Sequence, residues 1–158
     1  MSLKDTLAED LKTAMRAGDE VRKSTLRLLL TAITKAEVPG EDDPGAGRQT
    51  LDDNQVIAVI AGQAKQRRQS IDAFTRARRE DLVQIEQAEL DVLQTYLPAQ
   101  LSREEIAAEA RKAVDETGAS SPADKGKVMP VLMKRLGDRA DGRTVNEVVT
   151  ELLSGSSS

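Results

Sequence analysis

Apolar residues recur at helical spacing in separate stretches of the chain, and each stretch has its own start and stop signals. The first predicted helix follows Ser2, which forms a capping-box pattern with Asp5, and it stops at Gly18. Its apolar residues recur every three or four positions: Leu3, Leu7, Leu11, Ala14 and Met15. Asp19 can cap a second helix, whose apolar face consists of Leu26, Leu29, Leu30 and Ile33. The short connection between the two helices favours an antiparallel pair.

A polar segment separates this pair from a longer apolar pattern. Residues 38–50 contain prolines, glycines and acids but no apolar periodicity, which predicts a mobile loop. Asp52 or Asp53 can cap the helix that follows, whose apolar positions are Val56, Ile57, Ile60, Ala64, Ile71 and Phe74. The pattern either breaks near residues 77–79 or continues into a fourth helix, which carries Leu82, Ile85, Leu90 and Leu93.

A proline marks the joint between two predicted helical bodies. Pro98 disfavours helical dihedral angles at Leu97 and has no amide hydrogen, so a helix cannot continue regularly through it. We therefore predict that the two bodies are joined at residues 96–101. The serine-rich end of the chain, residues 154–158, is expected to be a disordered tail.

Three helices are predicted after the joint. The first begins with a capping-box pattern of Ser102 with Glu105 and ends at Gly118, where a left-handed C-terminal cap belongs. The second opens with Pro122 at its first position, and Pro130 predicts a kink or a restart within it because proline removes one backbone hydrogen bond. The last has one apolar face, made of Val145, Val148, Val149, Leu152 and Leu153.

The composition supports helices rather than strands. The chain has 158 residues, of which 39% are hydrophobic and 32% charged, as in soluble globular proteins. With one Tyr, one Phe and no Trp, the core must come from aliphatic residues and Met, which suits packing of helix on helix. The predicted fold class is therefore all-α.

The absence of cysteine excludes disulfides and thiolate zinc sites, and it is compatible with a cytoplasmic location. The apolar runs of the chain, such as residues 28–30, are too short to cross a bilayer or to form a signal-peptide core. We therefore expect no membrane partner.

Few residues of the chain are suited to catalysis. Histidine and cysteine are absent, and no nucleophile elbow, phosphate-binding loop or dinucleotide fingerprint is present. Acidic residues cluster at residues 41–43 and at Glu86 with Glu89, but the first group lies in the predicted loop and the second has ordinary helix-surface spacing. We expect no intrinsic enzymatic activity, no metal and no cofactor.

The net charge of −4 and the pI near 5.0 argue against a non-specific nucleic-acid binder, but the charges are unevenly distributed. Residues 65–79 hold six bases and one acid, and residues 119–143 hold six bases and three acids. The first cluster contains four residues that share part of a helical face: Lys65, Arg68, Arg76 and Arg79. For this face the favoured interpretation is a solvated surface paired with the acids that follow it: Glu80, Asp81 and Glu86.

The second cluster is the candidate RNA-binding site: Lys125, Gly126, Lys127, Lys134, Arg135, Arg139, Gly142 and Arg143. A glycine inside a helix costs about 1 kcal/mol relative to alanine, so Gly126 suggests a close approach to the backbone, by a neighbouring helix or by a ligand. Gly137 and Gly142 can also be a loop cap and an Asp-Gly turn. With few aromatic side chains to stack on bases, recognition would be of RNA shape and phosphates.

The same region carries a family resemblance, together with positions spread over the rest of the chain: Ala14, Met15, Leu26, Arg27, Lys65, Gln66, Arg67, Arg68, Arg79, Glu80, Asp81, Leu82, Tyr96, Leu97, Pro98, Ala119, Ser120, Asp124, Gly126, Lys127, Val128, Met129, Gly137, Arg139, Ala140, Asp141 and Gly142. In combination these resemble the GatB/YqeY domain, found at the tail of the GatB amidotransferase subunit and in free-standing YqeY-like proteins. Pro130 departs from the family pattern, which has glycine there.

The resemblance implies an N-terminal helical domain at 1–95 and a three-helix C-terminal domain at 99–153. It implies an accessory role related to tRNA, alongside glutamine-dependent carbon–nitrogen ligase components whose catalytic domains are missing from this chain. tRNA is then the expected partner. The alternative is a helical adaptor that uses the same C-terminal surface to bind a protein.

Overall fold

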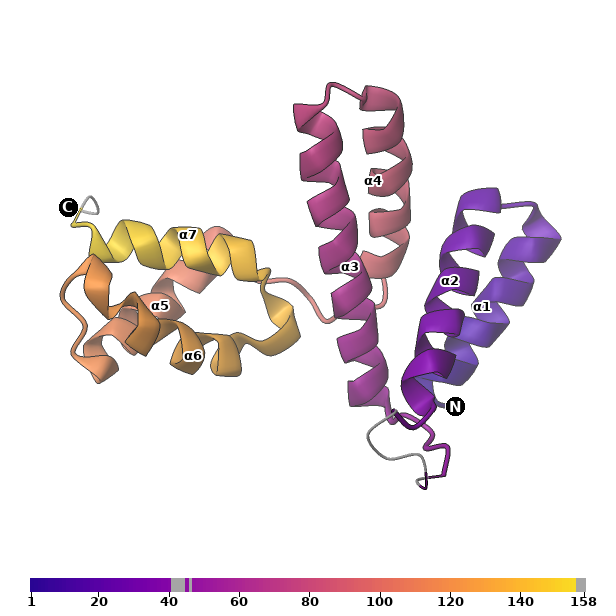
Figure 1. Ribbon diagram of the computed structural model, residues 1–158, viewed down its shortest axis with the longest axis horizontal. Coiled ribbons are helices and arrows are strands. Elements are labelled where there is room, and N and C mark those ends of the chain that lie inside the picture. Colours follow the sequence, from indigo (N-terminus) through magenta and orange to yellow (C-terminus); the bar gives the residue numbers. More distant parts are fainter. Residues whose placement is uncertain (41–44, 46, 156–158) are drawn as a thin grey trace. The chain divides into compact units, whose positions relative to one another are not determined.

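A computed structural model describes residues 1–40, 45 and 47–155, and every regular element in that part of the chain is helical (Figure 1). The elements in chain order are α1 (Leu3–Ala17), α2 (Glu20–Glu37), α3 (Asp53–Arg76), α4 (Glu80–Gln94), α5 (Arg103–Thr117), the 3₁₀ turn η1 (Pro122–Asp124), α6 (Lys125–Leu136), the 3₁₀ turn η2 (Gly137–Arg139) and α7 (Gly142–Leu153). The prediction of an all-α fold is confirmed.

Side-chain caps begin the helices where the sequence predicts them. The Oγ of Ser2 accepts a hydrogen bond from the amide of Asp5 at 3.1 Å, and the Asp5 carboxylate accepts one from the amide of Ser2 at 3.3 Å. This bonding lowers the pKa of Asp5. Asp19 caps α2, and Asp52, rather than Asp53, caps α3. Gly18 ends α1 in the left-handed region, with φ of 68°.

The long apolar pattern after residue 52 breaks, so that α3 and α4 are separate helices. The amide of Arg79 donates to the carbonyl of Phe74 at 2.9 Å, and the amide of Arg78 donates to that of Thr75 at 3.1 Å. These two bonds form a Schellman motif, which requires a left-handed residue after the helix. That residue is Arg78, with φ of 57°.

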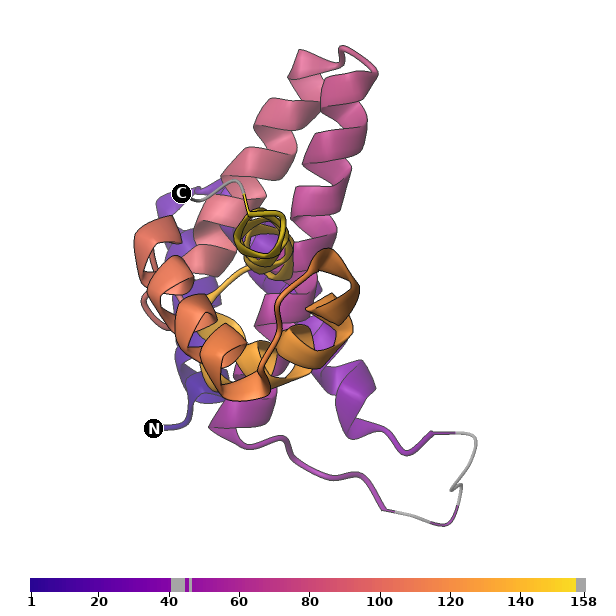
Figure 2. The same cartoon turned by 90° about the vertical axis from the view of Figure 1, so that its left-hand side faces the viewer.

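The chain divides into two compact units, residues 1–97 and 98–158. In the first unit α1 and α2 form one antiparallel hairpin, and α3 and α4 form another (Figures 1 and 2). Its buried apolar core consists of Leu7, Leu26, Leu29, Ile33, Val56, Ile60, Ala64, Leu90 and Leu93. In the second unit α5, α6 and α7 pack around Ile106, Ala110, Ala113, Val128, Leu132, Leu136, Val145, Val148, Val149 and Leu153. That each unit folds on its own stays a prediction.

A kink or a restart is expected at Pro130 in the second helix after the joint. The restart is wrong, because α6 continues through Pro130 as one helix, and the kink stays a prediction. The amide missing at Pro130 would have bonded to the carbonyl four residues earlier, at Gly126. Gly126 is exposed, so water can bond to this carbonyl instead. The helix therefore tolerates the proline.

The last two residues of the predicted joint, Gln100 and Leu101, form hydrogen bonds with the rest of the second unit. The amide of Leu101 donates to the carbonyl of Arg139 at 2.8 Å, and the side-chain amide of Gln100 donates to that of Asp138 at 2.9 Å.

The remaining expectations concern two polar segments, the loop at 38–50 and the tail at 154–158. Residues 41–44, 46 and 156–158 lie outside the described residues, so the mobility of the loop at 38–50 and the disorder of the tail stay predictions.

Candidate nucleic-acid interface

The first part of the candidate site is the beginning of α6. The carboxylate of Asp124 accepts hydrogen bonds from the amides of Ser120 at 2.9 Å and Ser121 at 3.3 Å, and this bonding lowers the pKa of Asp124. The ammonium of Lys127 lies 3.5 Å from the same carboxylate, although 70% of the Lys127 side chain is exposed. Lys125 has no ion-pair partner among the described residues. The start of α6 thus presents one partly neutralised lysine and one free lysine.

Gly126 lies between these two lysines. A Cβ built at this position would meet no described atom within 4 Å, so the expected close approach of a neighbouring helix is wrong. The glycine is exposed, and its backbone is open on the outer side of the helix. This open backbone is compatible with contact from a ligand, which is the other interpretation of the glycine.

The second part of the candidate site is the end of α6. Arg135 forms an ion pair with Glu116 of α5, which raises the pKa of Arg135 and lowers that of Glu116. Lys134 is exposed and has no ion-pair partner in the part of the chain that the structure describes. The charge available to an anion here therefore comes mainly from Lys134.

Arg139 is in η2 and turns back onto the end of α6. Its guanidinium donates to the carbonyl of Arg135 at 3.1 Å and to that of Leu136 at 3.4 Å, so it caps the helix. The same residue lines an open cleft with Glu105 and Glu109 of α5. These two carboxylates reduce the positive potential around Arg139.

The third part is the beginning of α7. Gly142 is the first residue of this helix, and a Cβ added there would lie 3.8 Å from the terminal methyl of Met133. The Nε of Arg143 is 3.5 Å from the carboxylate of Glu147, which Arg103 of α5 also contacts at 3.2 Å. Arg143 is therefore held on the surface of its own helix.

The predicted site residues do not form one cluster. Residues 125–127 begin α6, whereas residues 134 and 135 are about 10–15 Å further along its axis, from a rise of about 1.5 Å per residue. The contact of Gly142 with Met133 brings the start of α7 to the later part of α6. The structure thus divides the site into a group at the start of α6 and a second group around its end.

The other basic cluster, on α3, has a different environment. Arg79 pairs with Asp81 through two hydrogen bonds of 3.1 and 3.0 Å, as the solvated-face interpretation predicts, and the pKa of Asp81 is lowered by this pair. Glu86 is not paired with that face. It contacts Arg67 at 3.1 Å, and Arg67 also contacts Glu89 at 3.1 Å.

Arg67 was not singled out as a site residue, and it joins α3 to α4. The side chains of Glu86 and Glu89 are 16% and 15% exposed, so these acids do not lie on an open helix surface. Burial raises the pKa of Glu89, and the charge of Arg67 opposes that shift. The buried Nε of Arg67 has no hydrogen-bond partner among the described residues. These contacts fit a structural role for the two glutamates.

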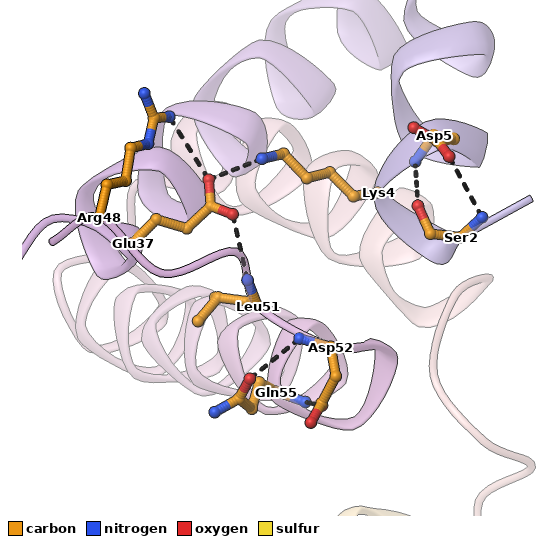
Figure 3. Close-up of polar contacts among 8 residues, drawn as sticks. All are labelled: Ser2, Lys4, Asp5, Glu37, Arg48, Leu51, Asp52 and Gln55. Atoms are coloured by element: carbon orange, nitrogen blue, oxygen red, sulfur yellow. Dashed lines mark hydrogen bonds and ion pairs between the residues drawn. The ribbon is translucent and has the colours of Figure 1, made fainter.

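Glu37 is the most connected polar residue that sequence reasoning missed (Figure 3). It is 3% exposed, and its carboxylate accepts hydrogen bonds from Lys4 at 2.6 Å, from the amide of Leu51 at 3.1 Å and from Arg48 at 3.5 Å. Bonding to Lys4 is the main cause of its lowered pKa. Glu37 thus ties the start of α1, the end of α2 and the approach to α3 together. Both oxygens are occupied, so it is poorly placed to act as a general base.

Tyr96 forms a second polar cluster in the first unit. Its hydroxyl donates to Asp10 at 2.5 Å and accepts from Arg22 at 3.0 Å, and the Arg22 guanidinium lies 5.8 Å from the ring centre. Burial, followed by the bond to Asp10, raises the pKa of Tyr96 to about 12. The phenol therefore stays protonated at neutral pH and anchors the end of the first unit.

The described residues hold no group of three carboxylates close enough together to bind a metal. None of the described helices combines the length and the hydrophobicity that a membrane span needs. The expected absence of catalysis, metal and cofactor stays a prediction.

These observations define a class of protein: a two-unit helical protein with structural polar clusters inside and basic groups on its surface. The Yqey-like protein family matches residues 4–153. The chain therefore belongs to the YqeY-like protein family, in agreement with the resemblance found in the sequence.

Similar proteins include several fungal ones named "Altered inheritance of mitochondria protein 41, mitochondrial". The protein of Eremothecium gossypii is 41% identical over 106 residues, which cover 66% of this chain but only 55% of that protein. The Kluyveromyces lactis protein is 32% identical over 142 residues, covering 88% of this chain and 69% of the relative. The Pyrenophora tritici-repentis protein is 30% identical over 152 residues, covering 93% and 78%.

These relatives contradict the expected cytoplasmic location, because their names describe mitochondrial proteins. The expectation rested on the absence of cysteine. Cysteine content indicates only whether a protein depends on oxidation, and it does not distinguish one reducing compartment from another.

Proposed function

We propose that this protein is an accessory RNA-binding protein without a catalytic centre of its own, and that tRNA is its ligand. The proposal extends the resemblance to the GatB tail, which belongs to a glutamine-dependent carbon–nitrogen ligase. The RNA-binding residues are the basic rim, defined as Lys125, Gly126, Lys127, Lys134, Arg135, Arg139, Gly142 and Arg143.

The start of α6 is the observation that carries this proposal. Lys125 and Lys127 flank the exposed Gly126, where an added Cβ would meet no described atom within 4 Å. Phosphate oxygens can approach such a backbone closely, and the two ammonium groups supply the charge. Lys127, Arg135 and Arg143 already contact carboxylates, so the affinity is expected to be modest.

Folded tRNA binding, measured by fluorescence anisotropy at several salt concentrations, tests the proposal. Each phosphate that is neutralised on a single strand contributes about −0.7 to the slope of log K against log salt concentration. Neutralisation of about three phosphates therefore predicts a slope near −2. The double change Lys127→Ala with Arg139→Ala should weaken binding and flatten the slope. Lys127 is exposed, so the loss of stability should be about 1 kcal/mol, from the hydrogen bonds of Arg139 to the end of α6. The proposal fails if the parent does not bind tRNA at low salt or if the double variant binds equally well.

The alternative function is an adaptor that binds a protein through the rim. The matched carboxylates beside the rim favour this alternative, since alternating charges suit a polar protein interface. Purification of the tagged full-length protein from its own cells, with and without ribonuclease, distinguishes the two. Partners that are lost with nuclease favour RNA, and partners that resist nuclease favour the adaptor.

A further inference from the structure

The turn between α3 and α4 carries an unusual concentration of positive charge. Arg76, Arg78 and Arg79 fall within four consecutive residues, and all three side chains are exposed. The turn is the end of the α3–α4 hairpin that extends beyond α1 and α2 (Figures 1 and 2). We call these three residues the hairpin-tip arginines.

Two of the hairpin-tip arginines are not neutralised. Arg79 is held by Asp81, but the side chains of Arg76 and Arg78 have no hydrogen bond or ion pair with any described residue. Lys65 is also exposed and unpaired within the described chain, and it lies eleven residues before Arg76, which is three helical turns along the same face of α3. Free cations thus extend from the tip along the hairpin, in contrast to the partly paired rim.

The backbone at Arg78 adds an independent observation. Arg78 occupies the left-handed position after α3, which costs a residue with a Cβ about 1–2 kcal/mol relative to glycine. The chain uses glycine at the corresponding ends of α1 and α5, where Gly18 and Gly118 have φ of 68° and 69°. No contact with a described residue compensates for the arginine at the α3 end. An external ligand for its side chain would explain it.

The surroundings of the tip indicate the chemistry of that ligand. Among the described residues, the exposed large hydrophobic ones are Met1, Met15, Val21, Leu28, Val38 and Ile85. Only Ile85, on α4, belongs to the α3–α4 hairpin, so a single apolar side chain accompanies the arginines there. A protein partner normally needs an apolar centre in its interface, whereas an RNA backbone is held by charge and hydrogen bonds. Arginine also matches phosphate with paired donors.

We infer that the hairpin-tip arginines, together with Lys65, form a second surface that contacts the phosphate backbone of RNA. This inference rests on the proposed function, because it assigns the same class of ligand to the first unit. It differs in location from the rim, and the two surfaces can be tested separately on the full-length protein.

The first experiment compares two double variants, one at the tip and one control, in folded tRNA binding between about 50 and 200 mM salt. Arg76→Gln with Arg78→Gly should raise Kd about tenfold at the lowest salt and reduce the salt slope by about 1.4, the effect of two lost phosphate contacts. Arg16→Gln with Arg27→Gln is the control for net charge, since both are exposed residues of α1 and α2 without described partners. It should change Kd less than twofold. Equal effects of the two variants would overturn the inference.

Arg78 alone provides a readout of folding as well as binding. Arg78→Gly should raise the folding equilibrium constant about fivefold or more, because the left-handed residue no longer has a Cβ, and yet weaken tRNA binding. Arg78→Lys keeps the charge and the Cβ but loses the paired donors, so it should bind less tightly than the parent and more tightly than Arg78→Gly. If Arg78→Gly binds tRNA as tightly as the parent, the tip does not contact RNA.

The outcome for the rim separates this inference from the proposed function. If only Lys127→Ala with Arg139→Ala weakens binding, the inference falls and the proposed site stands. If only the tip variant weakens binding, the inference stands and the rim is the wrong site. Failure of the parent to bind tRNA at 50 mM salt overturns both. Polyglutamate and unlabelled tRNA can also be compared as competitors of labelled tRNA. If polyglutamate displaces the labelled tRNA at a lower concentration of negative charges than unlabelled tRNA does, the partner is an acidic protein and the inference is overturned.

Discussion

The two units of the protein bury different kinds of side chain. Among the described residues, the buried set of the second unit is wholly apolar, whereas the first unit buries Glu37 and Thr25 beside its aliphatic core. The first unit also encloses the phenol of Tyr96 and the guanidinium of Arg67 in partly buried polar clusters. The interior of the second unit is therefore held by shape and hydrophobicity, with ion pairs on exposed side chains, whereas the interior of the first unit also contains directional contacts.

The polar contacts of the first unit join elements that are far apart in the sequence. Lys4 and Glu37 are 33 positions apart, and Asp10 and Tyr96 are 86 apart. Apolar contacts are not directional, but a buried carboxylate must meet specific donors, so these contacts select one arrangement of the two hairpins. We therefore expect acid or alkaline pH to destabilise the first unit before it destabilises the second.

The largest effects are expected from single truncations in each apolar core. Ile60 in the first unit and Leu132 in the second are fully buried, and replacement of either by alanine should cost about 2–5 kcal/mol of stability. Hydrogen exchange of the full-length protein should show faster exchange in α1–α4 for Ile60→Ala and in α5–α7 for Leu132→Ala. Faster exchange throughout the chain in both variants would mean that the units unfold as one.

Substitution of Glu37 should destabilise the first unit and remove part of its acid sensitivity. The folded pKa of Glu37 is lowered, so its contribution is present above its ordinary pKa of about 4.5 and is lost as the pH falls through the lower folded value. Glu37→Gln should therefore melt several degrees below the parent at pH 7, with a smaller difference at pH 3. Glu9→Gln, at an exposed pair on α1, is the control and should have little effect.

Tyr96 should give a smaller effect at the alkaline end. Its folded pKa of about 12 exceeds the ordinary value of 10, so its contribution is complete below pH 10 and is lost as the pH rises towards 12. Tyr96→Phe should cost about 1 kcal/mol at pH 7 through the lost hydrogen bonds. Denaturant unfolding between pH 8 and 12 should show the two proteins converging. Parallel curves across this range would contradict the assignment.

The smallest change expected is a gain in stability. Gly62 lies inside α3, and a Cβ there would meet no described atom within 4 Å, so Gly62→Ala should stabilise the first unit by about 0.5–1 kcal/mol. Gly126→Ala should stabilise the second unit by less, because position 126 is in the first turn of α6. If Gly126→Ala also weakens tRNA binding, the open backbone matters for function; unchanged binding would show that it does not.

The features that the sequence predicted correctly depend on neighbours within about five positions. The capping box of Ser2 with Asp5, the Asp19 cap and the left-handed end at Gly118 all involve local hydrogen bonds, so their residue types are sufficient signals. The apolar periodicity likewise located the cores. These local rules were enough for the helices and the fold class.

The candidate site was less predictable because charge pairing depends on tertiary contacts. Arg135 meets Glu116 across 19 positions, and Arg67 meets Glu86 across the same separation. Nothing in the spacing of the bases identifies these partners. The burial of Glu37 had no local signal either, since its donors come from α1 and from the segment that leads into α3.

The short joint has a further consequence for two surfaces that lie on different units. The amide of Leu97 is bonded to the carbonyl of Gln94, and Gln100 is bonded to the second unit, so only Pro98 and Ala99 separate the anchored positions. A tether of this length gives a high effective concentration, because once one surface holds an RNA molecule the other is confined close to it. If the rim and the hairpin-tip arginines both bind RNA, as we propose, two individually weak contacts act with avidity on an RNA long enough to reach both. On separate short RNAs that gain would be lost.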